Sequence, residues 1–142
     1  MLKNIYEIFD EVGRAASKKD AILVLQYNQT YTLKSVLKGM FDPRVKFAIT
    51  EIPPYKKSDA PPGLGYNSLH QEIHRAYLFV EGEPRAVNLT PKRREEILIQ
   101  ILEVMESREA EVFANMLLKK TDAYKGITLD TVKKAFPDIL PA

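Results

Sequence analysis

The stretch Ser107 to Pro137, SREAEVFANMLLKKTDAYKGITLDTVKKAFP, predicts two short helices joined by a basic corner. Apolar residues recur at helical spacing in its first part, and they do so again after Thr128, which can cap the second helix. Each helix therefore has one face to bury. The apolar positions are Ala110, Phe113, Met116, Leu117, Val132, Ala135 and Phe136.

The corner between these helices, residues 119–128, reads KKTDAYKGIT. Gly126 permits a sharp turn, and the first backbone N–H groups of the next helix lack partners within that helix. Lysines stand on both sides of the turn, at Lys119 and Lys125. Because a helix N-terminus favours anions, we expect this corner to bind phosphate.

Length and composition indicate one domain, residues 1–142. With 45% hydrophobic and 28% charged residues, the chain is typical of a soluble globular protein and long enough to bury its own core. It has no cysteine for a disulfide or a thiolate metal site, and no signal-peptide pattern opens it. No apolar run approaches the ~20 residues of a membrane span. We therefore expect a cytoplasmic protein.

Helical periodicity along the whole chain predicts an all-α fold, a single compact domain of about six to eight helices. The helix from Thr90 to Glu106 has the widest apolar face, so we expect it at the centre of the bundle. The stretch Phe47 to Ile52 is the only one that is ambiguous between helix and strand. The helices expected before the C-terminal pair are Leu2–Gly13, one capped by Ser17 and running to Tyr27, one after Asn28 reaching Met40, Pro43–Ile49, Ser68–Val80 and Thr90–Glu106.

Residues 50–67 predict a long loop inside this domain, because they contain four prolines and two glycines. Loops of this length in compact domains are usually functional or mobile.

Charge is segregated along the chain although the net charge is only +2. From Val12 to Lys57 there are nine basic and three acidic residues, Glu95 to Glu111 is acidic, and basic residues return from Lys119 onward. If the basic segments share one surface, the molecule has a cationic face of the kind that binds a phosphate backbone. The alternative is that these are ordinary solvated faces.

The C-terminal corner also carries a resemblance. The helix end Leu118-Lys119, the turn Gly126-Ile127-Thr128 and the run Lys134 to Pro137 resemble the end of the helical DNA-binding domain that precedes the catalytic core in phage ATP-dependent DNA ligases of the T-even type. Segments nearer the N-terminus follow in the same order at similar spacing. They are Ile5–Ile8, Val12-Gly13, Lys18-Lys19, Ala21–Leu23, Leu33–Val36, Val45–Ile49 and Pro53. The chain also resembles a family of small marine myovirus proteins without an assigned function.

The ligase resemblance implies docking on duplex DNA through the minor groove and the flanking phosphates. Such contacts are largely independent of sequence, because phosphates carry no base information and the minor groove is degenerate. The residues that the resemblance and the charges select for DNA binding are Lys18, Lys19, Lys34, Lys38, Arg44, Lys46, Lys119, Lys125, Gly126 and Thr128. Tyrosines near basic residues either stack on bases or pack in the core, and these are Tyr27, Tyr31, Tyr55, Tyr66 and Tyr124.

No motif for catalysis is recognised. Lys57 to Ala60 differs from the ligase adenylation motif by alanine in place of glycine, and Gly63-Leu64-Gly65 is too short for a phosphate loop. His70 and His74 share a helix face but lack a third metal ligand. The pairs Glu95-Glu96 and Glu109/Glu111 are expected on solvated helix faces. We therefore expect no catalytic residue, no metal and no cofactor.

These observations favour a non-catalytic protein of phage DNA metabolism that binds duplex DNA, with its preference for nicks open. The alternative is an adaptor that engages a replication, transcription or host protein through the Pro-rich loop with Tyr55, Leu64 and Tyr66. A weaker third hypothesis is an enzyme that uses His70 and His74.

Overall fold

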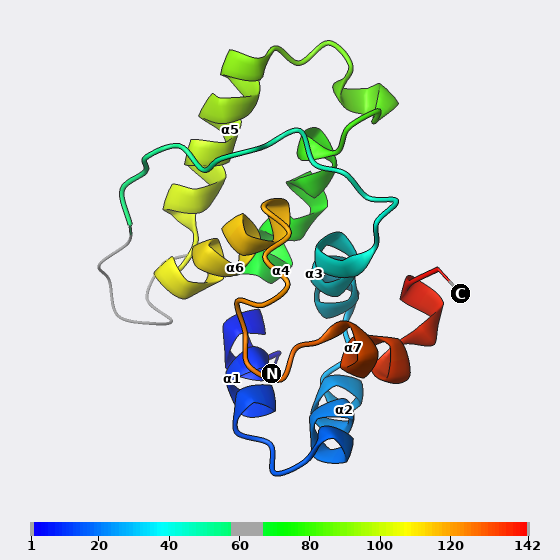
Figure 1. Ribbon diagram of the computed structural model, residues 1–142. Coiled ribbons are helices and arrows are strands. Elements are labelled where there is room, and N and C mark those ends of the chain that lie inside the picture. Colours follow the sequence, from blue (N-terminus) through cyan, green and yellow to red (C-terminus); the bar gives the residue numbers. More distant parts are fainter. Residues whose placement is uncertain (1, 58–66, 142) are drawn as a thin grey trace.

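Helix α6 (Ser107–Leu117) occupies the middle of the fold (Figure 1), which the computed structural model describes for residues 2–57 and 67–141. It contacts α1 (Ile5–Gly13), α3 (Tyr31–Phe41), α4 (Leu69–Glu72) and α5 (Pro91–Val104). The expectation that the Thr90–Glu106 helix is central is therefore wrong. Helix α5 buries four of its 14 residues, whereas α6 buries seven of its 11.

The all-α prediction is confirmed, with seven α-helices in the described ranges. Two isolated bridges, Phe47 with Val80 and Asn67 with Met105, are the only β pairing there. Buried apolar residues from all seven α-helices form one cluster. None of the described helices combines the length and apolarity needed to cross a bilayer. The remaining elements are α2 (Lys18–Tyr27), α7 (Leu129–Ala135) and the 3-10 helices η1 (Ile73–Phe79), η2 (Pro84–Ala86) and η3 (Pro137–Ile139).

Side-chain caps set several helix starts where the sequence predicts them. Ser17 Oγ accepts from the Asp20 N–H at 3.1 Å, and Thr128 Oγ1 accepts from the Thr131 N–H at 3.2 Å. Each such cap is worth about 1 kcal/mol. Helix α1 begins at Ile5, later than predicted, because Asn4 and Glu7 form a capping box there.

The predicted helix Pro43–Ile49 does not exist. The Asp42 carboxylate accepts the Arg44 N–H at 2.9 Å, which fixes a turn in place of a helix start. The chain then becomes extended at Phe47, where the Ala48 N–H donates to the Phe79 carbonyl at 2.7 Å. The stretch Phe47 to Ile52, which is ambiguous between helix and strand in the sequence, is therefore extended at Phe47, which pairs with Val80.

The predicted helix Ser68–Val80 is broken into α4 and η1. Helix α4 has a single turn, and Ile73 to Phe79 continue as a 3-10 helix. With three residues per turn, Ile73, Ala76 and Phe79 fall on one face, and two of them are buried. Apolar residues at every third position are compatible with an α-helix and with a 3-10 helix. The periodicity alone therefore does not distinguish the two.

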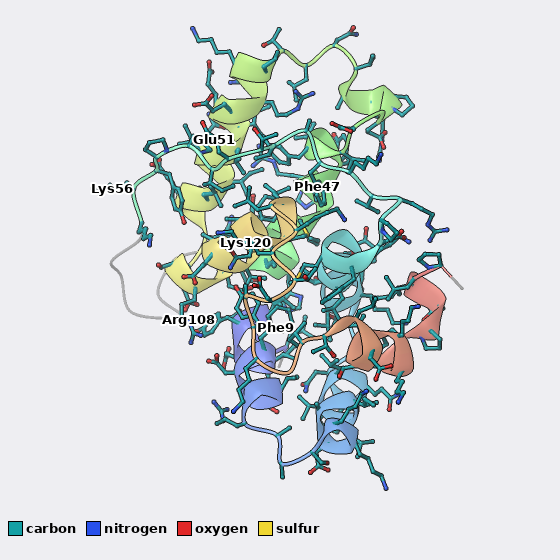
Figure 2. The ribbon with its side chains drawn as sticks, viewed as in Figure 1. Phe9, Phe47, Glu51, Lys56, Arg108 and Lys120 are labelled. Carbon is teal, nitrogen blue, oxygen red and sulfur yellow. The ribbon has the colours of Figure 1, made fainter. Side chains whose placement is uncertain are left out.

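The described part of the Pro-rich loop, residues 50–57, runs without regular structure beside α5 (Figure 2). The Lys56 N–H donates to Glu103 Oε2 of α5 at 2.7 Å. Tyr55 is partly buried against the core. The expectations for Ser58 to Ala60, Gly63 to Gly65 and Tyr66 lie outside the described residues.

Candidate nucleic-acid interface

Four of the ten predicted DNA-binding residues meet at one hollow, which we call the corner pocket. It has a volume of about 420 Å³ and lies between the α1–α2 turn and the segment that enters α7. Lys18 comes from the start of α2, and Lys125, Gly126 and Thr128 come from near the other end of the chain. The other lining residues are Val12, Gly13, Ala15, Ser17, Ala21 and Thr131.

Gly126 allows the two sides of the corner pocket to come this close. Its φ of +83° lies in the left-handed region, which glycine adopts without cost. A Cβ on Gly126 would stand 3.1 Å from the Val12 carbonyl oxygen and 3.0 Å from Val12 Cγ1. The glycine that the sequence assigns to a turn therefore also seats the loop against the end of α1.

Two lysines contact one exposed carboxylate beside the corner pocket, and a third lysine lines the pocket itself. Lys18 forms an ion pair with Asp130 of α7, and Lys134 Nζ lies 3.6 Å from the same carboxylate. Lys125 is exposed on the facing loop. Desolvation and the nearby charge of Lys134 both lower the pKa of Lys18. These three lysines outnumber the two nearest acidic residues, Asp130 and Asp20 in the first turn of α2.

The N-terminus of α2 opens beside this pocket, since Ser17 caps that helix and lines the hollow. Its ten residues place a partial positive charge there. Lys19 follows on the exposed side of α2. Helix α7 has seven residues, and the Thr128 cap already takes the Thr131 N–H. The features of the corner that attract an anion are therefore its lysines and the N-terminus of α2, whose first turn also carries Asp20.

Lys34 and Lys38 of α3 contact the end of the chain. Lys34 Nζ lies 3.6 Å from an Asp138 carboxylate oxygen and 5.3 Å from the centre of the Phe136 ring. Lys38 Nζ donates to the Ile139 carbonyl at 3.1 Å. These two lysines hold the C-terminal segment against α3, a role that the sequence pattern does not indicate.

A second basic cluster, which we call the Asp42 junction, surrounds a fully buried carboxylate at the end of α3. Asp42 accepts from Lys38 Nζ and from Arg44 Nη2, each at 2.8 Å. The Arg44 hydrogen bonds, aided by Lys38 and opposed by burial, hold the pKa of Asp42 well below its usual range. Two predicted DNA-binding cations therefore neutralise an internal acid.

Lys119 belongs to the Asp42 junction as well. Its Nζ donates to the Gly39 carbonyl at 2.8 Å and to the Asp42 carbonyl at 2.9 Å. These carbonyls end α3, where helices leave acceptors without partners. Burial lowers the pKa of Lys119, with Asp42 acting in the opposite sense. The side chain thus caps a helix from within and does not reach the corner pocket.

Lys46 is the remaining predicted residue. It is exposed in the turn after the Asp42 junction, and its carbonyl accepts the Glu81 N–H at 2.8 Å. The ten predicted residues thus separate into a corner group and a group around α3 and its C-terminal end.

His70 and His74 do not converge on a common site. Both ring nitrogens of His70 have partners, Thr32 Oγ1 and the Lys3 carbonyl, each at 2.8 Å. His74 is exposed and faces a different pocket. No group of three or more potential metal ligands occurs in residues 2–57 and 67–141.

Glu109 corrects another expectation, because it is fully buried and not on a solvated face. Its Oε1 accepts the Tyr6 N–H at 3.0 Å and its Oε2 accepts the Leu69 N–H at 2.9 Å. Burial raises the pKa of Glu109, and these two hydrogen bonds act against that rise. One carboxylate of α6 therefore caps the starts of both α1 and α4. The sequence contains little indication that Glu109 is buried, since a glutamate in a helical pattern is usually exposed.

The tyrosines divide between packing and exposure. The Tyr124 ring centre lies 4.8 Å from that of Phe9, and Tyr124 is partly buried against the core. Tyr27 is 88% exposed and Tyr31 is 76% exposed, which leaves both able to stack on a partner. Tyr55 is partly buried.

Comparison with known proteins gives one match and one absence. No curated protein matches the chain. Residues 8–123 match the model of a family described as a family of unknown function, DUF6433. Because this match covers most of the 142 residues, the chain belongs to the DUF6433 family.

Proposed function

We propose that this protein is a non-catalytic, largely sequence-independent duplex DNA-binding protein whose corner pocket receives a backbone phosphate. The observation that supports this is the convergence of Lys18 and Lys125 on one hollow beside the N-terminus of α2. Lysines and helix N-termini are the groups that commonly contact DNA phosphates. Action in phage DNA metabolism and a ligase-like minor-groove approach are parts of this proposal that rest on the resemblance.

The proposed interface includes fewer than the ten predicted residues, because several of them are engaged in contacts within the protein. Lys119, Lys38 and Arg44 are engaged at the Asp42 junction, so we assign the phosphate contacts to the corner lysines. A phosphate at the corner competes with Asp130 for Lys18 and Lys134. The contacting set is Lys18, Lys19, Lys125 and Lys134, of which Lys134 was not selected from the sequence.

The test is fluorescence anisotropy with labelled nicked and intact duplexes at two or more salt concentrations. Four phosphate contacts predict that the logarithm of affinity falls with the logarithm of salt at a slope of about −3.6. Unrelated duplex sequences should bind alike, because the contacts carry no base information. Any difference between nicked and intact duplex measures the nick preference directly.

Charge reversal tests the location of the interface. Lys18→Glu with Lys125→Glu should abolish salt-sensitive binding, because it places two carboxylates at the corner pocket beside Asp130. The matched control is Lys92→Glu, which reverses an exposed lysine on α5, far from the corner (Figure 1). If the parent fails to bind either duplex at about 50 mM salt and micromolar protein, the DNA proposal is wrong and the adaptor alternative replaces it.

A further inference from the structure

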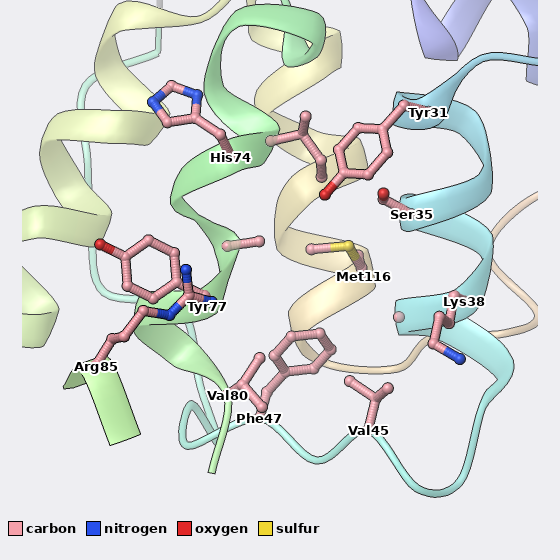
Figure 3. A pocket seen from close by; sticks show the side chains of 13 residues that line it. Tyr31, Ser35, Lys38, Val45, Phe47, His74, Tyr77, Val80, Arg85 and Met116 are labelled. Atoms are coloured by element: carbon pink, nitrogen blue, oxygen red, sulfur yellow. The ribbon is translucent and has the colours of Figure 1, made fainter. Parts of the chain in front are cut away.

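A second hollow of about 420 Å³ lies between α3 and η1, with α6 behind it, and we call it the η1 pocket (Figure 3). It is separate from the corner pocket and shares no lining residue with it. Its inner surface is apolar and is formed by three parts of the chain, the segment after α3, η1 with the residue that follows it, and α6. The apolar lining residues are Val45, Phe47, Ile73, Ala76, Val80 and Met116.

Gly39 shapes the inner end of the η1 pocket. A Cβ on this glycine would lie 2.8 Å from Met116 Cγ and 3.2 Å from Phe47 Cζ. Glycine in the middle of a helix costs roughly 1 kcal/mol relative to alanine. Here it lets Met116 and Phe47 pack directly against the α3 backbone, which forms an apolar surface between α3 and η1.

The rim of the η1 pocket is polar and basic. In Figure 3 the hydroxyl groups of Tyr31 and Ser35 point toward the space between α3 and η1. Three basic side chains line the pocket, namely Lys38, His74 and Arg85, and none of its lining residues within the described ranges carries a carboxylate. The lining therefore offers basic groups to an anion, which competes with two carboxylates outside the lining, Asp42 at Lys38 and Glu83 at Arg85.

Arg85 is the cation best placed to contact an occupant. Its guanidinium lies 4.1 Å from the centre of the Tyr77 ring, and its Nε donates to Glu83 Oε1 at 2.7 Å. These contacts hold the planar group in one orientation, and a guanidinium held in this way loses little freedom when it binds an anion. Lys38 is committed to Asp42 and to the Ile139 carbonyl, so it contributes less.

From these observations we propose that the η1 pocket binds a small organic anion that has a flat apolar body and a single anionic group. The body lies on Phe47, Ala76 and Met116, and the anionic group reaches Arg85 at the rim. The volume is within the range of small-molecule sites, which are mostly apolar with a few placed polar groups. This proposal does not depend on DNA binding, because it concerns a different part of the surface.

The test uses two fluorescent probes with nearly the same body, anilinonaphthalene sulfonate and the uncharged phenylnaphthylamine, titrated into the full chain. We expect one saturable site for the sulfonate and weaker binding of the uncharged probe. Arg85→Gln should weaken sulfonate binding by about tenfold, the size of one lost hydrogen bond to a charged group, and leave the uncharged probe nearly unchanged. Arg93→Gln is the control, since Arg93 is also exposed and paired with a glutamate, Glu96, but lies on α5.

Ala76→Phe fills the η1 pocket and should block both probes. Amide NMR spectra of the parent with the sulfonate should shift around Tyr31, Ala76 and Tyr77, and spectra of the variant establish that it remains folded. If Ala76→Phe fails to fold, Arg85→Gln still decides, because its side chain is 67% exposed and its loss leaves the core intact. Equal sulfonate affinity in the parent and Arg85→Gln, or shifts centred outside this pocket, would overturn the proposal.

Discussion

At the corner pocket Lys18 and Lys125 stand at the edge of an open hollow, whereas at the Asp42 junction Lys119 donates to two backbone carbonyls and Lys38 to a buried carboxylate. The side chains have the same chemistry in both places. What differs is the set of acceptors around them, because α3 ends beside Lys119 with carbonyls that need donors. Lys18 also has a carboxylate partner, but that partner, Asp130, is 55% exposed, whereas the Asp42 side chain is fully buried. A basic residue is therefore more available to a ligand where its partner is exposed to solvent, because an exposed ion pair is weak.

Removal of Asp42 should have the largest effect, because this residue organises the whole junction. We expect Asp42→Ala to lower the free energy of unfolding by about 3 kcal/mol, since a buried carboxylate with several charged partners is lost. Urea unfolding followed by circular dichroism measures this. The control Asp122→Ala alters an exposed loop aspartate and should change stability by less than about 0.5 kcal/mol. If Asp42→Ala and Asp122→Ala destabilise the protein equally, the Asp42 junction contributes no more to stability than an exposed loop residue does.

Replacement of Lys119 should have the next largest effect. Lys119→Met keeps the length of the side chain but leaves the Gly39 and Asp42 carbonyls without their donor, which we expect to cost about 2 kcal/mol. Its exposed neighbour supplies the control, Lys120→Met, with an expected change below about 0.5 kcal/mol. DNA affinity of the folded Lys119→Met protein should match the parent. A selective loss of DNA affinity with unchanged stability would instead place Lys119 in the interface.

The direction in which stability changes with pH should identify the contribution of Asp42. Because the folded-state pKa of Asp42 is lowered, its ionised form contributes stability above the unfolded-state pKa of about 3.9, and this contribution is lost as pH falls. The stability gap between the parent and Asp42→Asn should therefore narrow below about pH 4. Burial raises the pKa of Glu109, so that residue shifts stability with pH in the opposite direction. A gap that stays constant down to pH 2 would contradict the ion pairs at the junction.

The smallest stability effect is expected at the corner pocket. Lys125→Met should change the free energy of unfolding by less than about 0.5 kcal/mol, as is usual for exposed substitutions. Its effect should appear in DNA binding, where losing one phosphate contact makes the salt slope shallower by about one. An unchanged slope would remove Lys125 from the proposed interface while leaving the Asp42 junction unaffected.

Helix type and helix boundaries were largely readable from the residues. Thr128, Ser17 and Thr90 mark helix starts because a hydroxyl can accept an N–H of the first turn, which is a local event. Besides the start of α1, which lies three residues later than predicted, the failures lie at Pro43–Ile49 and at Ile73–Phe79. There the backbone conformation depends on the pairing of Phe47 with Val80, two residues far apart in the sequence.

The all-α class, most of the helices and the glycine turn at Gly126 follow from local sequence, since they depend on periodicity, capping and φ within a few residues. Which charged residues face solvent depends instead on tertiary packing. It buried Glu109 and Asp42, engaged Lys119 inside the fold, and brought Lys18 beside Lys125 from opposite ends of the chain. The physical reason is that an ionisable group takes its role from the donors, acceptors and water around it, and that environment exists only after distant segments have packed together.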